Sequence, residues 1–293
     1  MDSKCNIALV MAGAVSAGAY TAGVLDFLIQ ALDEWQQARD NNDPTAPPHQ
    51  VNLKLLTGAS AGGMTAAIAA TIIVGRPHQP IGNTDPGQNF ADNVLFQSWV
   101  NDIDIEPLLG LSDLDNKQPL LSLLDSSVLD DIANKALRPE HTGQRKAWAD
   151  AELELILTLA NLRGVPYNIP FAADDQAQPA PDRPGHGMRQ HRDYLQFSFA
   201  AGNDAVSHQL DWQGQHANWD LLRQGALATG AFPLGLKPRA IQQPGGLYDQ
   251  RRFRTEGPGK LDNGDCLCVI EPQIRPAWGG TTPADYQFVS VDG

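Results

Sequence analysis

Over the first quarter of the chain, continuous runs of apolar residues alternate with segments in which apolar residues recur at helical spacing. Residues 7–11 (IALVM) form an uninterrupted apolar run, which is typical of a parallel strand buried on both faces. Residues 20–37 then repeat apolar side chains three and four positions apart, as one face of a helix requires. Residues 51–56 indicate a second strand, and residues 64–74 a second, buried helix. This order predicts a mostly parallel central sheet between helices, a three-layer α/β/α fold.

The rest of the chain is less regular but also predicts both helices and strands. Residues 93–137 are expected to be helical in pieces, whereas residues 172–193 and 240–265 are rich in polar, proline and glycine residues and predict loops. Nothing resembles a linker between two self-sufficient halves, so we predict a single domain over residues 1–293. The other predicted elements are strands at residues 152–162, 194–200 and 286–291 and a helix at residues 219–229.

Charge and composition indicate which partners and which location the protein can have. The formal net charge is −13, which argues against nucleic acid as a partner because phosphate binding needs a basic face. An anionic membrane would repel the molecule on average, although a local patch can still make peripheral contact. The N-terminal apolar run is punctuated by glycines, and no apolar run is long enough to span a bilayer. We therefore expect no signal peptide and no transmembrane helix, and a protein that is cytoplasmic or peripheral to a membrane.

The strongest chemical motif follows the second predicted strand. Gly58-Ala59-Ser60-Ala61-Gly62 has the G-x-S-x-G spacing of a nucleophile elbow, in which a strand turns sharply into a helix and exposes a serine. Small neighbours are needed because the backbones crowd one another at this turn. The serine also lies at a helix N-terminus, where amides favour an anion. Ser60 is therefore the predicted nucleophile.

A second loop of small residues follows the first predicted strand. Residues 13–18 can aim successive amides at one point, which is what an oxyanion hole requires. The G-x-G-x-x-G spacing of a dinucleotide site is absent, so no nucleotide cofactor is expected. Metal binding is not expected either. His186 and His191 lack a neighbouring carboxylate motif, and the one C-x-C pair offers too few ligands.

Together these motifs resemble the patatin-like phospholipases. Gly18-Ala19-Tyr20-Thr21-Ala22-Gly23-Val24-Leu25 is similar to the family's GAYxAGVL helix, and Gly58 to Gly62 to its serine elbow. In that family an Asp-Gly motif at the end of a late strand completes a Ser–Asp dyad. Here Asp292-Gly293 ends the run FVSV, and residues 226–233 (ALATGAFP) resemble the family's A-x-A-S-x-A-x-P helix end.

The resemblance implies a serine acyl hydrolase that acts on fatty-acyl esters of lipids without a cofactor. Ser60 is then the nucleophile and Asp292 the general base. The amides of Gly13, Ala14, Val15 and Ala61 would hold the oxyanion. The sequence stops directly after the Asp-Gly motif, where the family continues, so we expect residues 1–293 to be a patatin-like catalytic domain truncated at its C-terminal end.

Departures from the family pattern keep a second function open. The family's GGG positions fall on Gly13, Ala14 and Val15, and its basic position falls on Ala17. A β-branched residue tolerates positive φ poorly, and the missing cation would weaken oxyanion binding. The alternative is a catalytically impaired lipid-binding or scaffolding protein. An α/β-hydrolase is disfavoured, because no histidine follows His216 to complete its chain order.

Overall fold

A computed structural model describes most of the chain in two compact units. The described residues are 4–14, 18–82, 90–114, 119–138, 144–170, 185–199, 208–210, 217–253, 255–261, 264–270 and 274–293. The first unit comprises Met1–Ala160, Arg192–Ile241 and Val289–Gly293, and the second Asn161–His191 and Gln242–Phe288. One catalytic domain over residues 1–293 stays a prediction.

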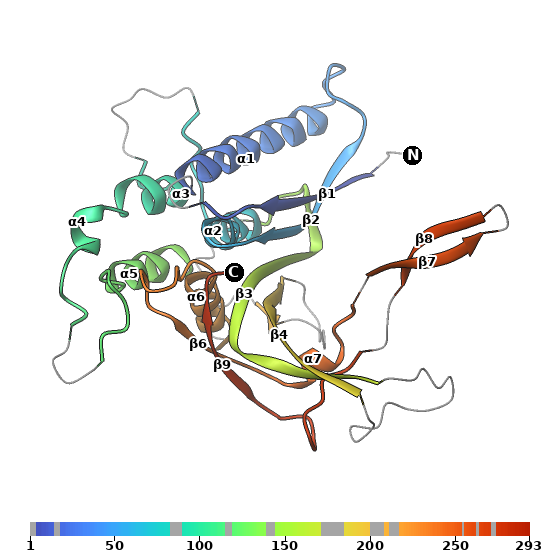
Figure 1. Cartoon of the computed structure of the whole chain (residues 1–293). Coiled ribbons are helices and arrows are strands. Elements are labelled where there is room, and N and C mark those ends of the chain that lie inside the picture. Colours follow the sequence, from blue (N-terminus) through green and yellow to red (C-terminus); the bar gives the residue numbers. More distant parts are fainter. Residues whose placement is uncertain are drawn as a thin grey trace. The chain divides into compact units, whose positions relative to one another are not determined.

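The predicted order of the N-terminal elements is confirmed (Figure 1). Strand β1 (Lys4–Met11) precedes helix α1 (Gly18–Asp40), and strand β2 (Gln50–Gly58) precedes helix α2 (Ala61–Val74). The described elements that follow are α3 (Val94–Phe96), the π-helix η1 (Gln97–Asn101), α4 (Ile105–Leu108), α5 (Ser127–Ala136), β3 (Ala149–Pro170), β4 (Gly185–Ser198), β5 (His208–Gln209), α6 (Ala217–Thr229), β6 (Arg239–Gln243), α7 (Gly246–Asp249), β7 (Thr255–Leu261), β8 (Gly264–Ile270) and β9 (Tyr286–Val291).

The central sheet is mixed, with mostly parallel strands flanked by helices, consistent with a three-layer α/β/α fold. Its seven strands run in the order β1-β2-β3-β4-β5, while β9 pairs with both β3 and β6. Strands β1, β2 and β3 are parallel, and Met11, Gly58 and Leu157 share one level across them. The loops that leave β1 and β2 therefore begin side by side at the same edge of the sheet, which is where open α/β sheets bind ligands.

Helix α2 forms the centre of the first unit. It packs on β1 and β2 and against α1 and α6. Its alanines at positions 66, 67, 69 and 70 are fully buried, and such small side chains let helix and sheet approach closely. Among the described residues, no helix is both long and apolar enough to cross a bilayer.

Two expectations from the sequence are wrong. Residues 240–265 were expected to be loop-rich, yet β6, α7 and β7 lie largely within them. Residues 185–193 belong to strand β4 rather than to a loop, while residues 171–184 lie outside the described part of the chain. Most side chains in the first half of β4 are exposed, so this half has no alternation of apolar and polar residues from which a strand could be predicted.

Candidate active site

Ser60 occupies the turn between β2 and α2 in a strained conformation. Its φ of 52° and ψ of −129° lie in a region that residues with a side chain rarely adopt. Such strain costs about 1–3 kcal/mol and is concentrated at functional sites. The conformation places Ser60 directly before the first helical residue, Ala61, as the elbow motif predicts.

Crowding explains the two glycines that flank the serine. A β-carbon on Gly58 would lie 2.4 Å from the carbonyl carbon of Gly62. A β-carbon on Gly62 would lie 2.4 Å from the carbonyl oxygen of Met11, at the end of β1. Both distances are far inside van der Waals contact. The G-x-S-x-G spacing is thus needed here so that the end of β1, the end of β2 and the start of α2 can meet.

Asp292 is held at the same edge of the sheet by the end of β9. Its amide donates a hydrogen bond to the Ala231 carbonyl at 3.0 Å, and the Gly293 amide donates to the Thr229 carbonyl at 3.1 Å. A β-carbon on Gly293 would lie 1.9 Å from the Thr158 carbonyl oxygen. The Asp-Gly pair is therefore fixed against β3 and the end of α6, and only glycine fits its second position (Figure 1).

Thr229 connects the two predicted catalytic residues. Its Oγ1 accepts a hydrogen bond from the Ser60 amide at 3.0 Å, and its own carbonyl accepts the Gly293 amide. The Thr229 side chain is completely buried. Sequence reasoning assigned no role to this residue. The ALATGAFP stretch, in which Thr229 takes the place of the family serine, was the feature that could have identified it.

The hydroxyl of Ser60 and the carboxylate of Asp292 are brought to one edge without a direct hydrogen bond. Among the described residues, the Asp292 carboxylate accepts only the amide of Gly293, at 3.1 Å. Both residues are partly exposed, so a substrate can reach them. Catalytic hydrogen bonds are often long in unliganded enzymes and shorten when substrate binds. The arrangement leaves Asp292 as a carboxylate acceptor next to the elbow.

The loop after β1 reaches the nucleophile. A β-carbon on Gly13 would lie 3.0 Å from the Ser60 β-carbon, so this glycine lies directly against the elbow. The amides of Gly13, Ala14 and Ala61 donate to no other described residue. They remain available as donors for a negatively charged oxygen. Val15 and Ala17, on which the family departures fall, lie outside the described residues.

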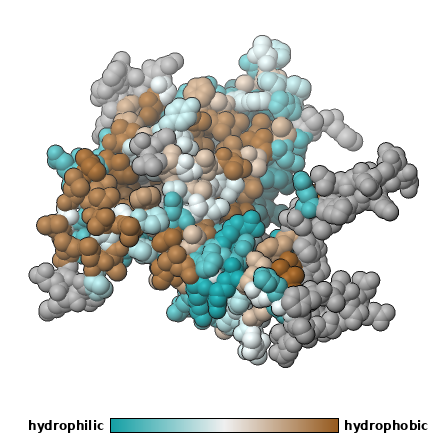
Figure 2. Space-filling model, in the orientation of Figure 1, coloured by the Kyte–Doolittle hydropathy of each residue, from teal (hydrophilic) through white to brown (hydrophobic). Residues whose placement is uncertain are grey.

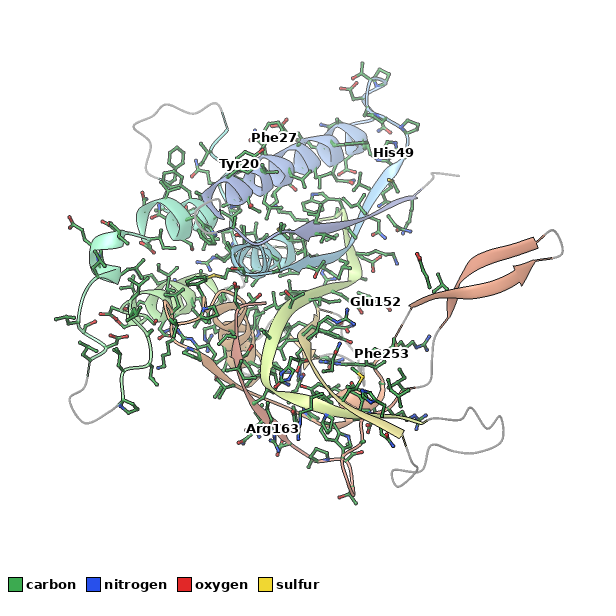
Figure 3. All side chains as sticks on the ribbon, in the orientation of Figure 1. Tyr20, Phe27, His49, Glu152, Arg163 and Phe253 are labelled. Carbon is green, nitrogen blue, oxygen red and sulfur yellow. The ribbon has the colours of Figure 1, made fainter. Side chains whose placement is uncertain are left out.

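Four of the five described histidines contact residues other than Ser60 and Asp292. His78 Nε2 lies 2.9 Å from the Asp26 carboxylate in a buried pair. Burial alone would raise the pKa of Asp26. Its contacts with His78, the Ile81 amide and Asn93 have the opposite and larger effect, so the pKa is lowered overall. His49 packs edge-on against Trp35 beyond the end of α1 (Figure 3). Other described histidines lie on strands: His191 contacts the Asn161 carbonyl at 2.7 Å, His208 packs on Phe197, and His186 lies on β4.

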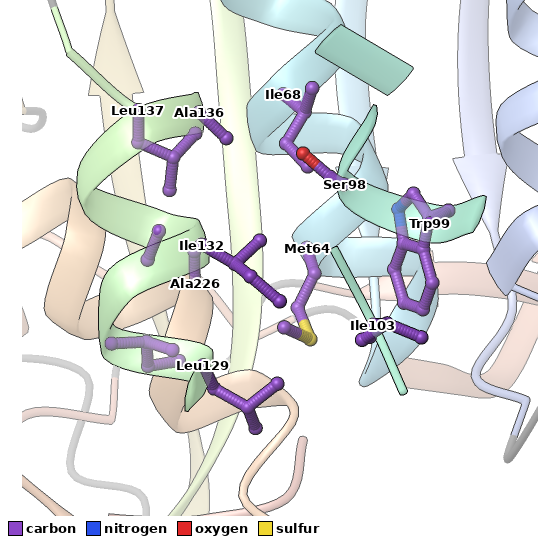
Figure 4. Close-up of a pocket in the computed structure, with 12 residues that line it drawn as sticks. Met64, Ile68, Ser98, Trp99, Ile103, Leu129, Ile132, Ala136, Leu137 and Ala226 are labelled. Atoms are coloured by element: carbon purple, nitrogen blue, oxygen red, sulfur yellow. The ribbon is translucent and has the colours of Figure 1, made fainter. Parts of the chain in front are cut away.

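An apolar pocket opens between α2, η1, α5 and α6 (Figure 4). It contains about 20 Å³ of free space, roughly enough for one water-sized group. Met64, one helical turn after Ser60, points into it together with Trp99 and Ile132. A β-carbon on Gly230 would lie 2.4 Å from the Met64 sulfur, so Met64 also packs beside the end of α6. Met64 thus connects the helix that begins at the elbow with a pocket lined mostly by apolar side chains.

Two comparisons show which known proteins the chain is similar to. The family model described as Patatin-like phospholipase matches residues 9–253. Among curated proteins, the chain is 34% identical over 319 aligned positions to one from Sinorhizobium fredii (strain NBRC 101917 / NGR234), described as "Uncharacterized protein y4iI". That alignment covers 98% of this chain and 43% of the relative. The chain thus spans less than half the length of this relative.

Proposed function

Because the chain belongs to the patatin-like phospholipase family, we propose that it is a lipid acyl hydrolase with Ser60 as nucleophile and Asp292 as general base. One observation carries the proposal most directly. A serine with strained backbone and the Asp-Gly pair are both hydrogen-bonded to Thr229. Strain of this kind persists only where the surrounding structure enforces it. Strain at a serine between a strand and a helix is what a nucleophile elbow requires.

The mechanism is acyl transfer to water in two steps. Asp292 accepts the hydroxyl proton of Ser60 while Oγ attacks the ester carbonyl carbon, and the tetrahedral oxyanion accepts hydrogen bonds from the amides of Gly13, Ala14, Val15 and Ala61. The C–O bond to the alcohol then breaks, and the alcohol leaves with the proton held by Asp292. A water molecule, deprotonated by Asp292, then attacks the acyl carbon. The bond from that carbon to Oγ breaks, Oγ takes the proton from Asp292, and the fatty acid is released. No metal takes part in either step.

The substrate class follows from the family and from the pocket. Family membership favours phospholipids, lysophospholipids or neutral acyl esters, and phospholipase A-type cleavage is the finer form of the proposal. The pocket lined by Met64 is suited to the acyl chain, because burying a methylene group there contributes about 0.8 kcal/mol. In the present conformation it admits only a small group, so a longer chain requires Met64 to rotate. Methionine is flexible enough to do so.

Shortening Met64 is expected to shift the chain-length preference. In Met64→Ala the free space in the pocket grows, so kcat/KM should rise for long or branched acyl esters relative to acetyl esters. We expect the ratio of kcat/KM for the long or branched ester to kcat/KM for the acetyl ester to increase about tenfold, as one or two additional buried methylenes imply. Met188→Ala, which shortens an exposed methionine on β4, is the matched control and should leave the ratio unchanged. An unchanged ratio in Met64→Ala would show that the acyl chain binds elsewhere.

Active-site labelling tests the proposed function directly. A fluorophosphonate should react with Ser60 in the folded protein, because a deprotonated serine hydroxyl next to oxyanion donors attacks phosphorus as it attacks an ester carbonyl. Intact-protein mass spectrometry should show one adduct, peptide mapping should place it on Ser60, and Ser60→Ala should show none. A folded sample that binds lipid but takes no label would instead support the lipid-binding or scaffolding alternative.

A further inference from the structure

A surface of exposed apolar side chains lies on the loops around α4 and α6. Large apolar residues that are more than half exposed come from α4 and the segment after it, and from the turn after α6. Figure 2 shows hydrophobic residues gathered over the part of the molecule that carries α4. We call this set the apolar rim; its described members are Ile105, Leu109, Leu111, Leu120, Leu121, Leu123, Phe232 and Leu234. Soluble proteins rarely expose so many large apolar side chains together without a binding role.

The two parts of the rim are joined to each other by backbone hydrogen bonds. The Leu123 amide donates to the Leu234 carbonyl at 2.8 Å, and the Leu124 amide donates to the Gly235 carbonyl at 3.0 Å. Leu234 is 80% exposed and has a φ of 66°, a conformation that leucine rarely adopts. The fold thus holds an apolar side chain in solvent at the cost of backbone strain.

A buried carboxylate supports the rim from beneath. Asp125 accepts hydrogen bonds from the amides of Ser112 and Ser127, at 2.9 and 3.0 Å, and from both hydroxyls. Burial alone would raise the pKa of Asp125, but these hydrogen bonds lower it to about 2. Through these hydrogen bonds Asp125 ties Ser112, in the segment after α4, to Ser127 at the start of α5.

The rim borders the candidate active site. Phe232 and Leu234 follow Ala231 in the chain, and the Ala231 carbonyl accepts the amide of Asp292. A lipid surface resting on this turn would bring ester bonds to the edge at which Ser60 and Asp292 lie. Proximity of this kind matters for a lipid hydrolase, because its substrate is delivered from an aggregate rather than from solution.

The charged residues near the rim indicate which kind of lipid surface the rim can bind. Residues 105–114, 119–123 and 232–236 contain Glu106 and Asp113, and the sequence places only Lys117 and Lys237 directly beside these ranges, so basic residues are not in excess. The whole chain carries a formal net charge of −13. An anionic lipid surface attracts basic segments and repels this one. Zwitterionic headgroups impose no such repulsion, so apolar contact can decide binding.

We propose that the apolar rim docks the enzyme on zwitterionic lipid surfaces and so selects substrate presented in them. This inference rests on the proposed lipid acyl hydrolase function, since that function supplies the reason for a lipid partner. The rim leucines enter the boundary between headgroups and acyl chains, as the apolar face of an interfacial helix does. Each leucine removed weakens partitioning by about tenfold, the amount that burying one such side chain contributes.

Vesicle partitioning tests the proposal. The full chain is floated with phosphatidylcholine vesicles, alone or with one-fifth phosphatidylglycerol, in wild type, Leu123→Ser and Leu234→Asn. Asparagine tolerates the φ of Leu234 better than leucine, so this variant keeps the turn while removing its apolar side chain. Leu162→Ser is the matched control, because Leu162 is 55% exposed but belongs to the second unit. Both rim variants should bind phosphatidylcholine about tenfold more weakly than wild type, and Leu162→Ser should bind like it.

Hydrolysis of a water-soluble short-chain ester separates this proposal from the proposed function. Rim variants that keep soluble-ester turnover but lose turnover on vesicles support docking. Wild type that hydrolyses the soluble ester yet does not bind phosphatidylcholine, or binds equally after both rim substitutions, overturns docking and leaves the hydrolase intact. Wild type that binds vesicles through the rim but hydrolyses neither substrate overturns the hydrolase. Tighter binding to phosphatidylglycerol-containing vesicles, or self-association through the rim without vesicle binding, also overturns the proposal.

Discussion

Ser60→Ala and Asp292→Asn are each expected to remove nearly all ester hydrolysis. Alanine removes the attacking oxygen, and loss of the nucleophile in a serine protease costs on the order of a millionfold in kcat. Asparagine keeps the shape of Asp292 but cannot accept the Ser60 proton, and loss of a general base costs about a hundred- to ten-thousandfold. Steady-state kinetics on a soluble short-chain ester should show both losses in kcat. Thermal unfolding should show that both variants fold.

The double variant distinguishes one proton-transfer unit from two separate contributions. If Ser60 and Asp292 act together, Ser60→Ala combined with Asp292→Asn should be no less active than Ser60→Ala alone, because the base has nothing left to deprotonate. Single replacement of each of the seven histidines provides the control set. Those replacements should leave kcat largely unchanged. A histidine variant as damaging as Ser60→Ala, together with a mild Asp292→Asn, would show that the general base is a histidine.

The elbow was predictable because local sequence determines it. Gly58 and Gly62 are needed for crowding within a few residues of Ser60, and the flanking apolar runs identify the strand and helix that meet there. The position of Asp292 at the end of a late strand was also predicted, from the dipeptide Asp292-Gly293 after an apolar run. What the sequence does not contain is the pairing of β9 with β3 and β6, which places that strand end at the elbow.

Other features depend on contacts between distant residues and left no local pattern. Strand β4 begins with exposed polar residues, so neither its start nor its length was predicted. The exposure of the apolar rim was not predicted either, because its residues are apolar. Leu109, Leu111 and Leu123 look like core residues in the sequence, and only the structure shows them exposed. Thr229 was recognised as part of a motif, but its bond to the Ser60 amide spans 169 positions along the chain.

Thr229→Val is expected to lower kcat by about a hundredfold with little change in KM. Valine has nearly the shape of threonine but cannot accept the hydrogen bond that the Ser60 amide donates to Oγ1 at 3.0 Å. A fully buried amide left without an acceptor costs about 1–3 kcal/mol, and the part-buried Ser60 amide should incur part of this cost, so the strained turn should relax and the hydroxyl should move away from Asp292. A displacement near 1 Å at a reacting group costs about a hundredfold in rate. Thr229 does not line the apolar pocket proposed for the acyl chain, so KM should stay close to that of wild type.

Thr229→Ser is the matched variant that separates positioning from packing. Serine keeps the acceptor oxygen but loses the γ-methyl group, which packs 2.7 Å from where a β-carbon on Gly63 would lie. If the hydrogen bond positions Ser60, Thr229→Ser should keep kcat within a few-fold of wild type, and its fluorophosphonate labelling rate should match. Thr229→Val should label slowly although Ser60 is present. Equal losses in both variants would assign the effect to the missing methyl contact, and unchanged kcat in Thr229→Val would show that the elbow holds its conformation without this bond. Thr229 therefore has a positioning role if the rate at which Ser60 reacts depends on the hydroxyl of residue 229 and not on the size of its side chain.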